Sequence, residues 1–262
     1  MGTQEKVTGV VLSAMPIGDY DKRLVILTKE YGKITAFARG AKRPTSSLLA
    51  SSQPFTFGDF QVYAGKSSYT VVSCQITQYF ESLRKDLRAV TYASYFCEMM
   101  EYLTRENLDG VEYLNLLYVS LRALEKKQMD FSLIRSVFEI RTMQVNGEAM
   151  EVFSCIRCGK QDNLEEMDSF FGNFSTRAGG PLCGDCIKKA SRGEMEDKSS
   201  DLLTLTPAAV YTVQYVQTVP MARLYSFRVS DQVRQELECL CSDYLNRYLN
   251  VHFRSLELLD LV

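Results

Sequence analysis

The spacing of hydrophobic positions changes once along the chain, near residue 80. Before that point, short apolar runs rich in β-branched residues alternate with turn residues, which is typical of strands. The pattern predicts five strands, at Lys6–Ser13, Leu24–Thr28, Ile34–Arg39, Phe57–Ala64 and Tyr69–Gln78. Gly32 can take the positive φ that a hairpin with a type I turn and a bulge requires between the second and third strands. Five short strands favour a small barrel, and the OB-fold is the commonest five-stranded solution.

From Leu83 onward apolar residues recur about every 3.6 positions, as they do on one face of a helix. Breaks at Asn107–Gly110 and Lys126–Asp130 separate three such faces, whose residues are Leu83, Leu87, Val90, Cys97, Met100 and Leu103, then Leu114, Leu117, Leu121 and Leu124, then Phe131, Ile134 and Phe138. Helix resumes at Thr206-Pro207, an N-cap followed by proline at the first helical position. A final helix is expected from Ser230, with an inner face of Val233, Leu237, Leu240, Tyr244 and Tyr248.

These patterns predict an α+β protein of several domains. We expect a five-stranded OB-fold barrel at residues 1–80 and an all-helical domain in two parts, 81–150 and 194–262, with a module inserted between them at 151–193. Residues 202–262 are expected to pack back on residues 81–148. The charged stretch Lys188–Asp201 is typical of a surface connection.

The inserted module contains two CxxC units, separated by 24 residues, with cysteines Cys155, Cys158, Cys183 and Cys186. A two-residue gap lets both sulfurs of a unit point at one ion, and Gly159 and Gly184 leave room for backbone amides to turn toward the sulfurs. Four thiolates complete a tetrahedral zinc shell with no open position. We therefore expect one structural Zn²⁺ per chain, with another metal or a redox role as the alternative. A nucleobase deaminase is excluded, because its signature needs a His-x-Glu and a proline directly before the cysteine.

Composition narrows the function classes further. With a single histidine, His252, mechanisms that need a His pair, a Ser-His-Asp arrangement or a His-ligated catalytic metal are nearly excluded, so we expect no enzyme. The role of His252 itself stays open. No apolar run approaches the roughly 20 residues of a membrane span, and the first residues lack the pattern of a signal peptide. We expect a reducing cytoplasm, where paired cysteines more often hold metal than form disulfides. The other cysteines are expected to be small buried hydrophobes: Cys74, Cys97, Cys239 and Cys241.

The formal net charge of -2 hides an asymmetry, because residues 1–80 carry 9 basic and 5 acidic side chains while residues 81–262 carry 21 and 27. Candidate phosphate contacts on the basic part are Lys22, Arg23, Arg39, Lys42, Arg43 and Lys66. Aromatic residues available for base stacking are Tyr20, Phe37, Phe57, Tyr63 and Tyr69. Basic surface loops and aromatic barrel cores are also common, so these residues alone leave nucleic-acid binding and an ordinary surface equally open. A P-loop is excluded, because Phe60 occupies the position of its first glycine.

The order of these parts resembles the RecO family of bacterial recombination-mediator and DNA-repair proteins. The resemblance covers essentially the whole chain. Its strongest elements are the run DYDKRLVILTKEYGKITAFARGAKR from Asp19, the second CxxC unit with its preceding residues, GGPLCGDC at Gly179–Cys186, and Ser255-Leu256-Glu257 in HFRSLELL.

The resemblance implies a non-enzymatic, DNA-binding protein with an OB-fold, a helical domain and a zinc module. It implies binding to single- and double-stranded DNA, annealing of complementary strands, and loading of RecA with RecR onto DNA coated by single-strand-binding protein, in gap and double-strand-break repair. It also implies a cytoplasmic, nucleoid-associated location. The four CxxC cysteines correspond to zinc ligands, and Arg39, Lys42 and Arg43 to DNA contacts.

A protein-interaction adaptor that binds no DNA is the alternative hypothesis. The acidic and apolar C-terminal two-thirds of the chain favour it. Binding of a labelled oligonucleotide at low salt distinguishes the two, because only the mediator requires it.

Overall fold

The computed structural model describes residues 3–161, 172–192, 202–249 and 251–259. The chain divides into two compact units. Unit 1 contains Met1–Gln128 and Phe253–Val262, and unit 2 contains Met129–His252. The chain therefore passes from unit 1 into unit 2 and returns to unit 1 at its C-terminus.

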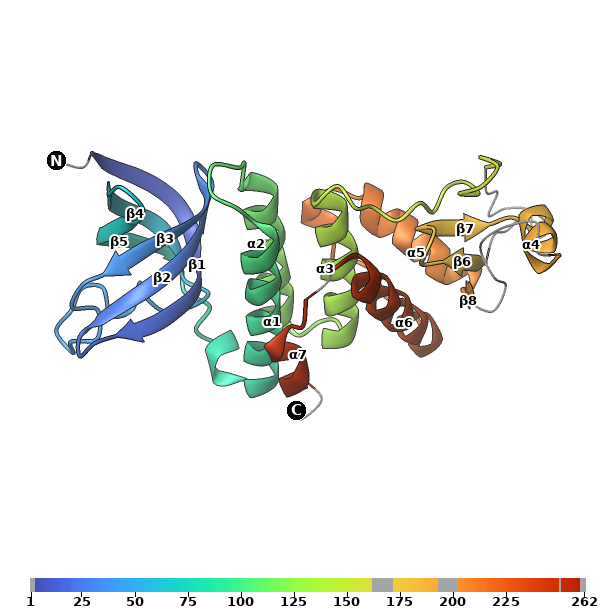
Figure 1. The fold of residues 1–262 in the computed structure, drawn as a ribbon. Coiled ribbons are helices and arrows are strands. Elements are labelled where there is room, and N and C mark those ends of the chain that lie inside the picture. Colours follow the sequence, from blue (N-terminus) through green and yellow to red (C-terminus); the bar gives the residue numbers. More distant parts are fainter. Residues whose placement is uncertain (1–2, 162–171, 193–201, 250, 260–262) are drawn as a thin grey trace. The chain divides into compact units, whose positions relative to one another are not determined.

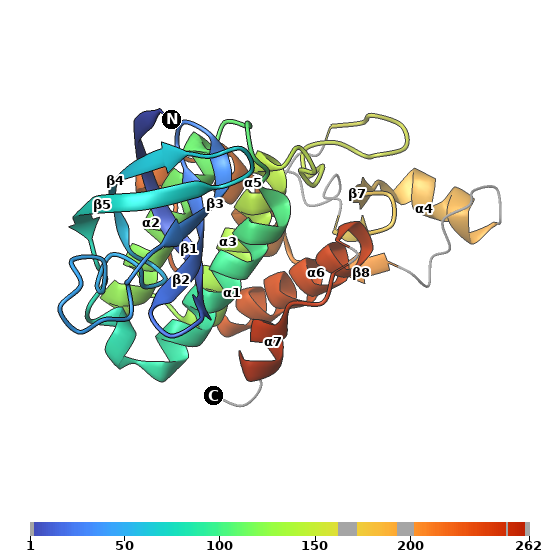
Figure 2. The same cartoon turned by 60° about the vertical axis from the view of Figure 1, so that its left-hand side comes forward.

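Unit 1 begins with a closed five-stranded barrel (Figures 1 and 2). Its strands are β1 (Gln4–Ile17), β2 (Asp21–Thr28), β3 (Gly32–Ala38), β4 (Phe57–Ala64) and β5 (Tyr69–Gln78). They follow one another around the barrel in the order β1-β2-β3-β5-β4, and only the β3–β5 pair is parallel. The five predicted strands are confirmed, β4 and β5 with the predicted bounds. The barrel is OB-like, as expected.

Strand β1 is long because it serves both sides of the barrel. Its first half pairs with β4 and its second half with β2, and the register shifts between Val11 and Ser13 where the strand bends. Alternate residues of the strands point inward. The fully or almost fully buried core includes Val7, Val11, Leu24, Ile26, Ile34, Ala36, Phe60, Val62 and Val71.

The turn between β2 and β3 depends on Gly32. Its φ of +60° lies in the left-handed region, as the sequence predicts. A Cβ at Gly32 would also lie 2.3 Å from the backbone oxygen of Arg105 and 2.6 Å from that of Leu108. The Lys33 N–H donates to the Arg105 carbonyl over 3.1 Å. The segment that follows helix α1 (Leu87–Leu103) is therefore held directly against the hairpin.

We expect Gly32→Ala to destabilise the protein by about 1–3 kcal/mol more than Gly18→Ala. Gly18 also has a positive φ, +52°, but nothing lies within 4 Å of a Cβ built there. Both variants carry left-handed strain of about 1–2 kcal/mol, and only Gly32→Ala adds an overlap with backbone atoms. Urea unfolding measures both free energies. Equal losses in the two variants would contradict a tight packing of the segment on the hairpin.

Helices α1 and α2 (Val111–Lys126) lie beside the barrel, and a short C-terminal helix, α7 (Arg254–Leu259), contacts α1 (Figure 1). A 3₁₀ turn, Leu83–Lys85, precedes α1. The Asp86 side chain caps α1 by accepting a hydrogen bond from the Ala89 N–H over 3.1 Å. The Glu98 carboxylate on α1 accepts hydrogen bonds from the backbone N–H groups of Arg254 and Ser255, the first residues of α7. These bonds hold α7 against α1.

The longest helices in the described part of unit 2 are α3 (Phe131–Val145), α5 (Pro207–Thr218) and α6 (Asp231–Tyr248), and a 3₁₀ turn, Met221–Arg223, lies between α5 and α6. Thr206 and Ser230 cap α5 and α6, which confirms both predicted starts. The Arg141 guanidinium on α3 donates to three backbone carbonyl oxygens at the end of α5, those of Val216, Gln217 and Val219. These bonds satisfy carbonyls that a helix end leaves without an intrahelical partner.

A small sheet and one helix complete unit 2. The strands β6 (Asn173–Ser175), β7 (Gly180–Leu182) and β8 (Leu202–Thr204) pair in the order β7-β6-β8, and α4 (Gly184–Ser191) follows β7. Helix α4 includes the first residues of the predicted connection Lys188–Asp201. The rest of that connection, from residue 193, lies outside the described residues.

The return of residues 202–262 onto the earlier helices is confirmed, but it is divided between the units. Helices α5 and α6 contact α3, whereas α7 contacts α1. Packing thus groups α1 and α2 with the barrel rather than with α3. The domain boundaries expected at residues 80, 150 and 193 do not coincide with this division, and they stay a prediction.

Three residues placed on apolar helical faces or among the expected buried cysteines are exposed. Leu87 is 71% exposed because it is the first residue of α1, where the helix does not yet face its partners. Tyr248, the last residue of α6, is also exposed. Cys239 is exposed while Cys241 is buried, since residues two apart on a helix point in different directions.

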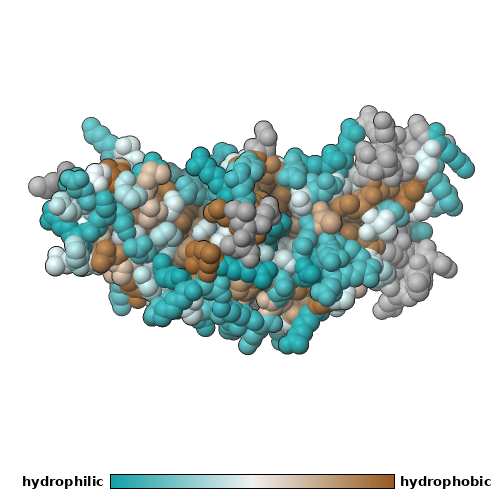
Figure 3. Space-filling model, turned by 90° about the horizontal axis from the view of Figure 1, so that it is seen from below, coloured by the Kyte–Doolittle hydropathy of each residue, from teal (hydrophilic) through white to brown (hydrophobic). Residues whose placement is uncertain are grey.

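Hydrophobic residues form small separate patches on the surface seen in Figure 3. Most of the described residues visible on this face are hydrophilic or intermediate. Within the described part of the chain, no helix is long and apolar enough to cross a membrane.

Candidate metal centre and nucleic-acid interface

The first CxxC unit lies on a tight loop closed by an isolated bridge between Ser154 and Gln161. Within it the Cys155 N–H donates to the Lys160 carbonyl over 2.8 Å, and the Gly159 N–H donates to the Cys155 carbonyl over 2.9 Å. Gly159 has a φ of +71°, which explains the glycine at this position. The loop thereby turns the cysteines of the unit toward the same side.

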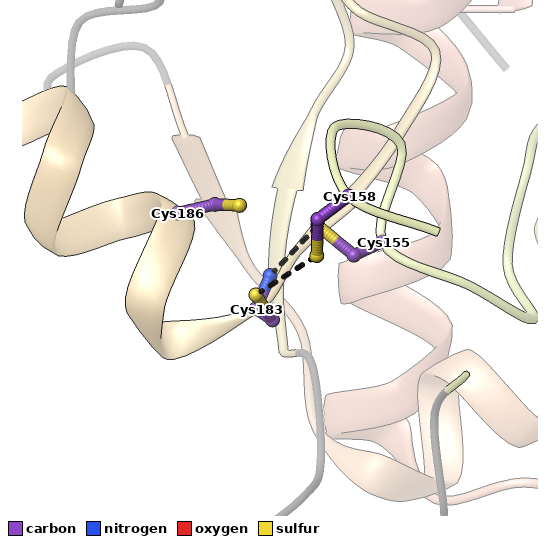
Figure 4. A group of neighbouring side chains, drawn as sticks. All are labelled: Cys155, Cys158, Cys183 and Cys186. Atoms are coloured by element: carbon purple, nitrogen blue, oxygen red, sulfur yellow. Dashed lines mark hydrogen bonds between the residues drawn. The ribbon is translucent and has the colours of Figure 1, made fainter. Parts of the chain in front are cut away.

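The second CxxC unit lies where β7 passes into α4. Cys183 follows the strand and Cys186 lies in the first turn of the helix, so the side chain of Cys186 extends from α4 toward the other three cysteines (Figure 4). A Cβ at Gly184 would meet no atom within 4 Å. The expected need for a small residue at Gly184 is therefore wrong, because the space there is open to solvent.

The four sulfurs form one cluster, with all ligand atoms within 4.8 Å of one another. The Cys158 and Cys183 sulfurs are 3.6 Å apart, and the Cys183 N–H donates to the Cys155 sulfur over 3.3 Å. A tetrahedral shell with metal–sulfur bonds of about 2.3 Å places sulfurs about 3.8 Å apart. The residues present therefore fit a four-coordinate metal ion, and the predicted grouping of Cys155, Cys158, Cys183 and Cys186 matches the cluster found.

The electrostatics of the cluster also favour a cation. Burial raises the pKa of Cys155, but backbone N–H groups of Cys183, Cys158 and Arg157 that donate to its sulfur outweigh burial and lower the pKa to about 7. Burial and the neighbouring thiols raise the pKa of Cys186. Several thiolates at this spacing repel one another in a partly buried site, and a divalent cation offsets that repulsion.

The outer surface of β1, β2 and β3 in unit 1 carries a mixed basic and apolar row. The strand register places Arg23 of β2 opposite Met15 of β1 on one side and Phe37 of β3 on the other. Arg23 and Met15 are exposed, and Phe37 is half-buried. A cation between apolar side chains suits contact with a phosphate and stacking of an adjacent base.

The connection after β3 brings three more predicted cations, Arg39, Lys42 and Arg43, beside the turn between β1 and β2. The Lys42 N–H donates to the Tyr20 carbonyl over 2.9 Å, and its Nζ donates to the Gly18 carbonyl over 3.2 Å. The Arg43 guanidinium lies 4.8 Å from the centroid of the Tyr20 ring, a cation–π contact. All three cations and Tyr20 are exposed.

Lys66 is exposed in the turn between β4 and β5, which the Gly65 N–H closes by donating to the Ser68 carbonyl over 2.9 Å. The next residue, Ser67, lines the same pocket as Arg23. OB-folds bind nucleic acid on this side, with strands 2 and 3 and the loops that join strands 1–2 and 4–5. We call this surface the barrel face, defined by Tyr20, Arg23, Phe37, Arg39, Lys42, Arg43 and Lys66.

Lys22 differs from the expectation, because its side chain points into the barrel. It is only 8% exposed, and its Nζ donates to the backbone oxygen and the hydroxyl of Ser52. Burial lowers the pKa of Lys22, and the charge of Lys42 lowers it further. Lys22 therefore anchors the connection between β3 and β4 and does not present its charge to a ligand.

The aromatic residues predicted to stack on bases also differ in exposure and position. Phe57 is buried, with edge contacts to Phe80 and Tyr118, so its expected role in base stacking is wrong. Tyr69 is half-buried and stacks on Tyr31. Tyr63 is exposed, but it lies on β4, away from β2 and β3. Tyr20 and Phe37 remain on the barrel face.

Comparison with known proteins assigns the chain to a family. The model described as Recombination protein O N terminal matches residues 1–80, and the model described as Recombination protein O C terminal matches residues 84–257. The chain belongs to the RecO family. The RecO N-terminal match ends two residues after β5, so it covers the barrel and its face.

Whole-length relatives agree with the RecO assignment. The chain is 31% identical over 254 residues to the DNA repair protein RecO of Alkaliphilus metalliredigens, with 97% of each chain covered. It is 32% identical over 252 residues to RecO of Acetivibrio thermocellus, covering 96% of this chain and 94% of the relative. RecO of Bacillus pumilus is 29% identical over 97% of this chain and 93% of its own. A function in DNA repair and recombination follows from the RecO family.

Two residues beside the barrel face, Met15 and Arg105, were not predicted from the sequence. Met15 extends β1 beyond its predicted end, and the alternation that continues through Met15 and Ile17 is the signal for it. Arg105 follows α1 and reaches the outer surface of β2 and β3 only through tertiary packing. No local sequence signal places Arg105 there.

Proposed function

We propose that this RecO-family protein is a recombination mediator in the repair of gaps and double-strand breaks. It binds single- and double-stranded DNA on the barrel face, anneals complementary strands, and with RecR helps to load RecA onto DNA coated by single-strand-binding protein. It makes and breaks no covalent bond. The observation that carries the proposal is the barrel face itself, where Arg43 lies over Tyr20 and Arg23 lies opposite Phe37. Its exposed cations are Arg23, Arg39, Lys42, Arg43 and Lys66.

The proposed annealing needs only sequence-tolerant contacts. Cations on the barrel face neutralise phosphates and release counterions, so two strands can approach each other. Exposed aromatic rings stack on any base. Base pairing between the strands then supplies the sequence discrimination, and the protein does not have to read bases.

The proposed metal is a structural Zn²⁺, one per chain, held by the four clustered cysteines. Soft thiolates select zinc over hard cations such as Mg²⁺ and Ca²⁺. When bound, the ion supplies a fixed tetrahedral crosslink and no open coordination position for a substrate. Among the described residues, Leu182, Ile187 and Leu202 pack with the cysteines in this cluster.

The proposed partners follow from this role. They are single- and double-stranded DNA, RecR, single-strand-binding protein and RecA on DNA, in the cytoplasm at the nucleoid. The barrel face accounts only for the DNA contacts, and the protein partners rest on the family.

An annealing assay tests the proposal. Two complementary oligonucleotides with donor and acceptor dyes, each coated by single-strand-binding protein, are mixed with the full chain, and energy transfer reports pairing. We expect faster pairing with the protein than without it, and RecA assembly on the coated strand only when RecR is also present. If a labelled oligonucleotide shows no saturable binding even at low salt, the proposal fails and the adaptor hypothesis is favoured.

A further inference from the structure

A pocket of about 360 Å³ lies within unit 1, next to the barrel face. Its floor is the outer surface of β2, β3 and the start of β5, where Val25, Thr35 and Tyr69 lie. Its wall is the end of α1 and the segment after it, which contribute Glu101 and the 105–106 pair. This volume lies within the range of pockets that take small ligands, about 300–1,000 Å³.

The wall of the pocket is fixed in place by backbone contacts. The Asn107 N–H donates to the Tyr31 carbonyl over 2.9 Å, and Gly32 pairs with Glu106 in an isolated bridge. A Cβ at Gly110 would lie 2.2 Å from the Thr28 backbone oxygen. The segment therefore cannot move away from the β2–β3 hairpin without breaking these contacts, and the pocket is preformed.

The charges that line the pocket are of both signs. Arg23, Lys33 and Arg105 supply cations, and Glu101 and Glu106 supply carboxylates. The Lys33 Nζ already donates to the backbone oxygen of Glu101. A free phosphate would be repelled by the carboxylates and a free metal cation by the guanidinium groups. A ligand that presents hydrogen-bond donors and acceptors on one edge satisfies both.

An aromatic ring completes the site. Tyr69 lines the pocket and stacks on Tyr31 with ring centroids 6.3 Å apart. Burial raises the pKa of Tyr69, and the neighbouring Glu106 raises it further by its charge and by accepting a hydrogen bond from the Tyr69 hydroxyl. The pocket thus combines a ring with donors and acceptors, the features that proteins use to hold an unpaired base.

We infer that this pocket holds one unpaired nucleobase of the DNA strand bound on the barrel face, with Glu106 accepting a hydrogen bond from an exocyclic amino group of the base and Arg23 contacting the adjoining phosphate. The inference rests on the proposed DNA binding and adds a base-holding site to it. A paired base cannot enter, because it is stacked between its neighbours in the duplex and would have to be unpaired and flipped out first. Pairing with a complementary strand therefore competes with the pocket, and single strands are held more strongly than the annealed product.

The test compares oligo(dC) with oligo(dT) of the same length at the same salt concentration, using the full chain. Cytosine presents an amino group and thymine does not, and a homopolymer offers the same base in every register. We expect the protein to bind oligo(dC) more tightly than oligo(dT), by about tenfold or more, from one additional hydrogen bond to a charged group. Glu106→Ala is expected to reduce this ratio to about one, and Tyr69→Phe, which keeps the ring, to lower it partly.

Glu81→Ala is the matched control, because Glu81 is also an exposed carboxylate of unit 1 but pairs with Lys85 and does not line the pocket. It should leave the ratio unchanged. A ratio near one in the unmodified protein, or a ratio that Glu106→Ala leaves unchanged, overturns the base pocket while DNA binding stands. Equal strengthening of both homopolymers by Glu106→Ala indicates a phosphate in the pocket and also overturns it. Failure to bind either homopolymer overturns the proposed function together with the pocket.

Discussion

Replacing Cys183 by serine is expected to abolish metal binding and to unfold the part of unit 2 built by the two CxxC units, β7 and α4. Structural zinc contributes about 10–16 kcal/mol of apparent binding free energy in zinc-finger peptides at pH 7. That is comparable with the whole stability of a typical domain, about 5–15 kcal/mol. The apolar residues that pack with the cysteines in the described part of the chain are too few to replace it. Metal content of the purified chain and limited proteolysis measure the two effects.

Cys239→Ser is the matched control for this variant. Cys239 is an exposed cysteine of unit 2 outside the cluster, so its replacement should leave one zinc per chain and the proteolysis pattern unchanged. Less than about half an equivalent of metal in the freshly purified, reduced protein would contradict the structural zinc site.

The barrel should tolerate the loss of metal. Its core belongs to unit 1 and shares no residue with the cysteine cluster. Cys183→Ser is therefore expected to retain binding of a short single strand while it loses the fold of the cysteine module. If Cys183→Ser lost DNA binding together with the fold of the cysteine module, the module would contribute to the DNA site.

The pattern of the sequence predicts those features that depend on neighbouring residues. Strands β4 and β5 were predictable to the residue, because apolar and polar positions alternate and Gly65-Lys66-Ser67-Ser68 marks the turn between them. The four cysteines were predictable as one cluster because their spacing alone implies a shared ion. The N-caps Thr206 and Ser230 follow from local hydrogen-bonding preferences.

Features that depend on distant segments were not predictable. Lys22 resembles any surface lysine in sequence, and only the approach of Ser52, thirty residues later, draws it inside the barrel. Phe57 belongs to a strand, but Phe80 and Tyr118 cover it. Helical periodicity likewise gives the bounds of α2 and α3 without saying that α2 packs with the barrel and α3 with α5 and α6.

The exposed cations of the barrel face, unlike the buried Lys22, are free to contact phosphates, so replacing them tests the DNA site directly. The triple variant Arg39→Ala, Lys42→Ala, Arg43→Ala is expected to weaken single-strand binding about tenfold or more at low salt. Each lost phosphate contact removes about 0.7 from the slope of log affinity against log salt on single strands, so the slope should become shallower by about 2. Fluorescence anisotropy of a labelled oligonucleotide over a salt series measures both quantities.

Two controls separate a specific site from a general effect of charge. Replacing Lys188, Lys189 and Arg192 by alanine changes the net charge equally, and these exposed residues lie in or beside α4; affinity and slope should stay the same. Lys22→Met removes a cation whose donors are already occupied by Ser52, so it should affect stability but leave the slope unchanged. If the barrel-face triple variant instead keeps the slope of the unmodified protein, phosphates are neutralised elsewhere and the barrel face is not the DNA site. A slope that changes only with the barrel-face residues would place the phosphates at Arg39, Lys42 and Arg43, because counterion release depends on which charges the strand actually contacts.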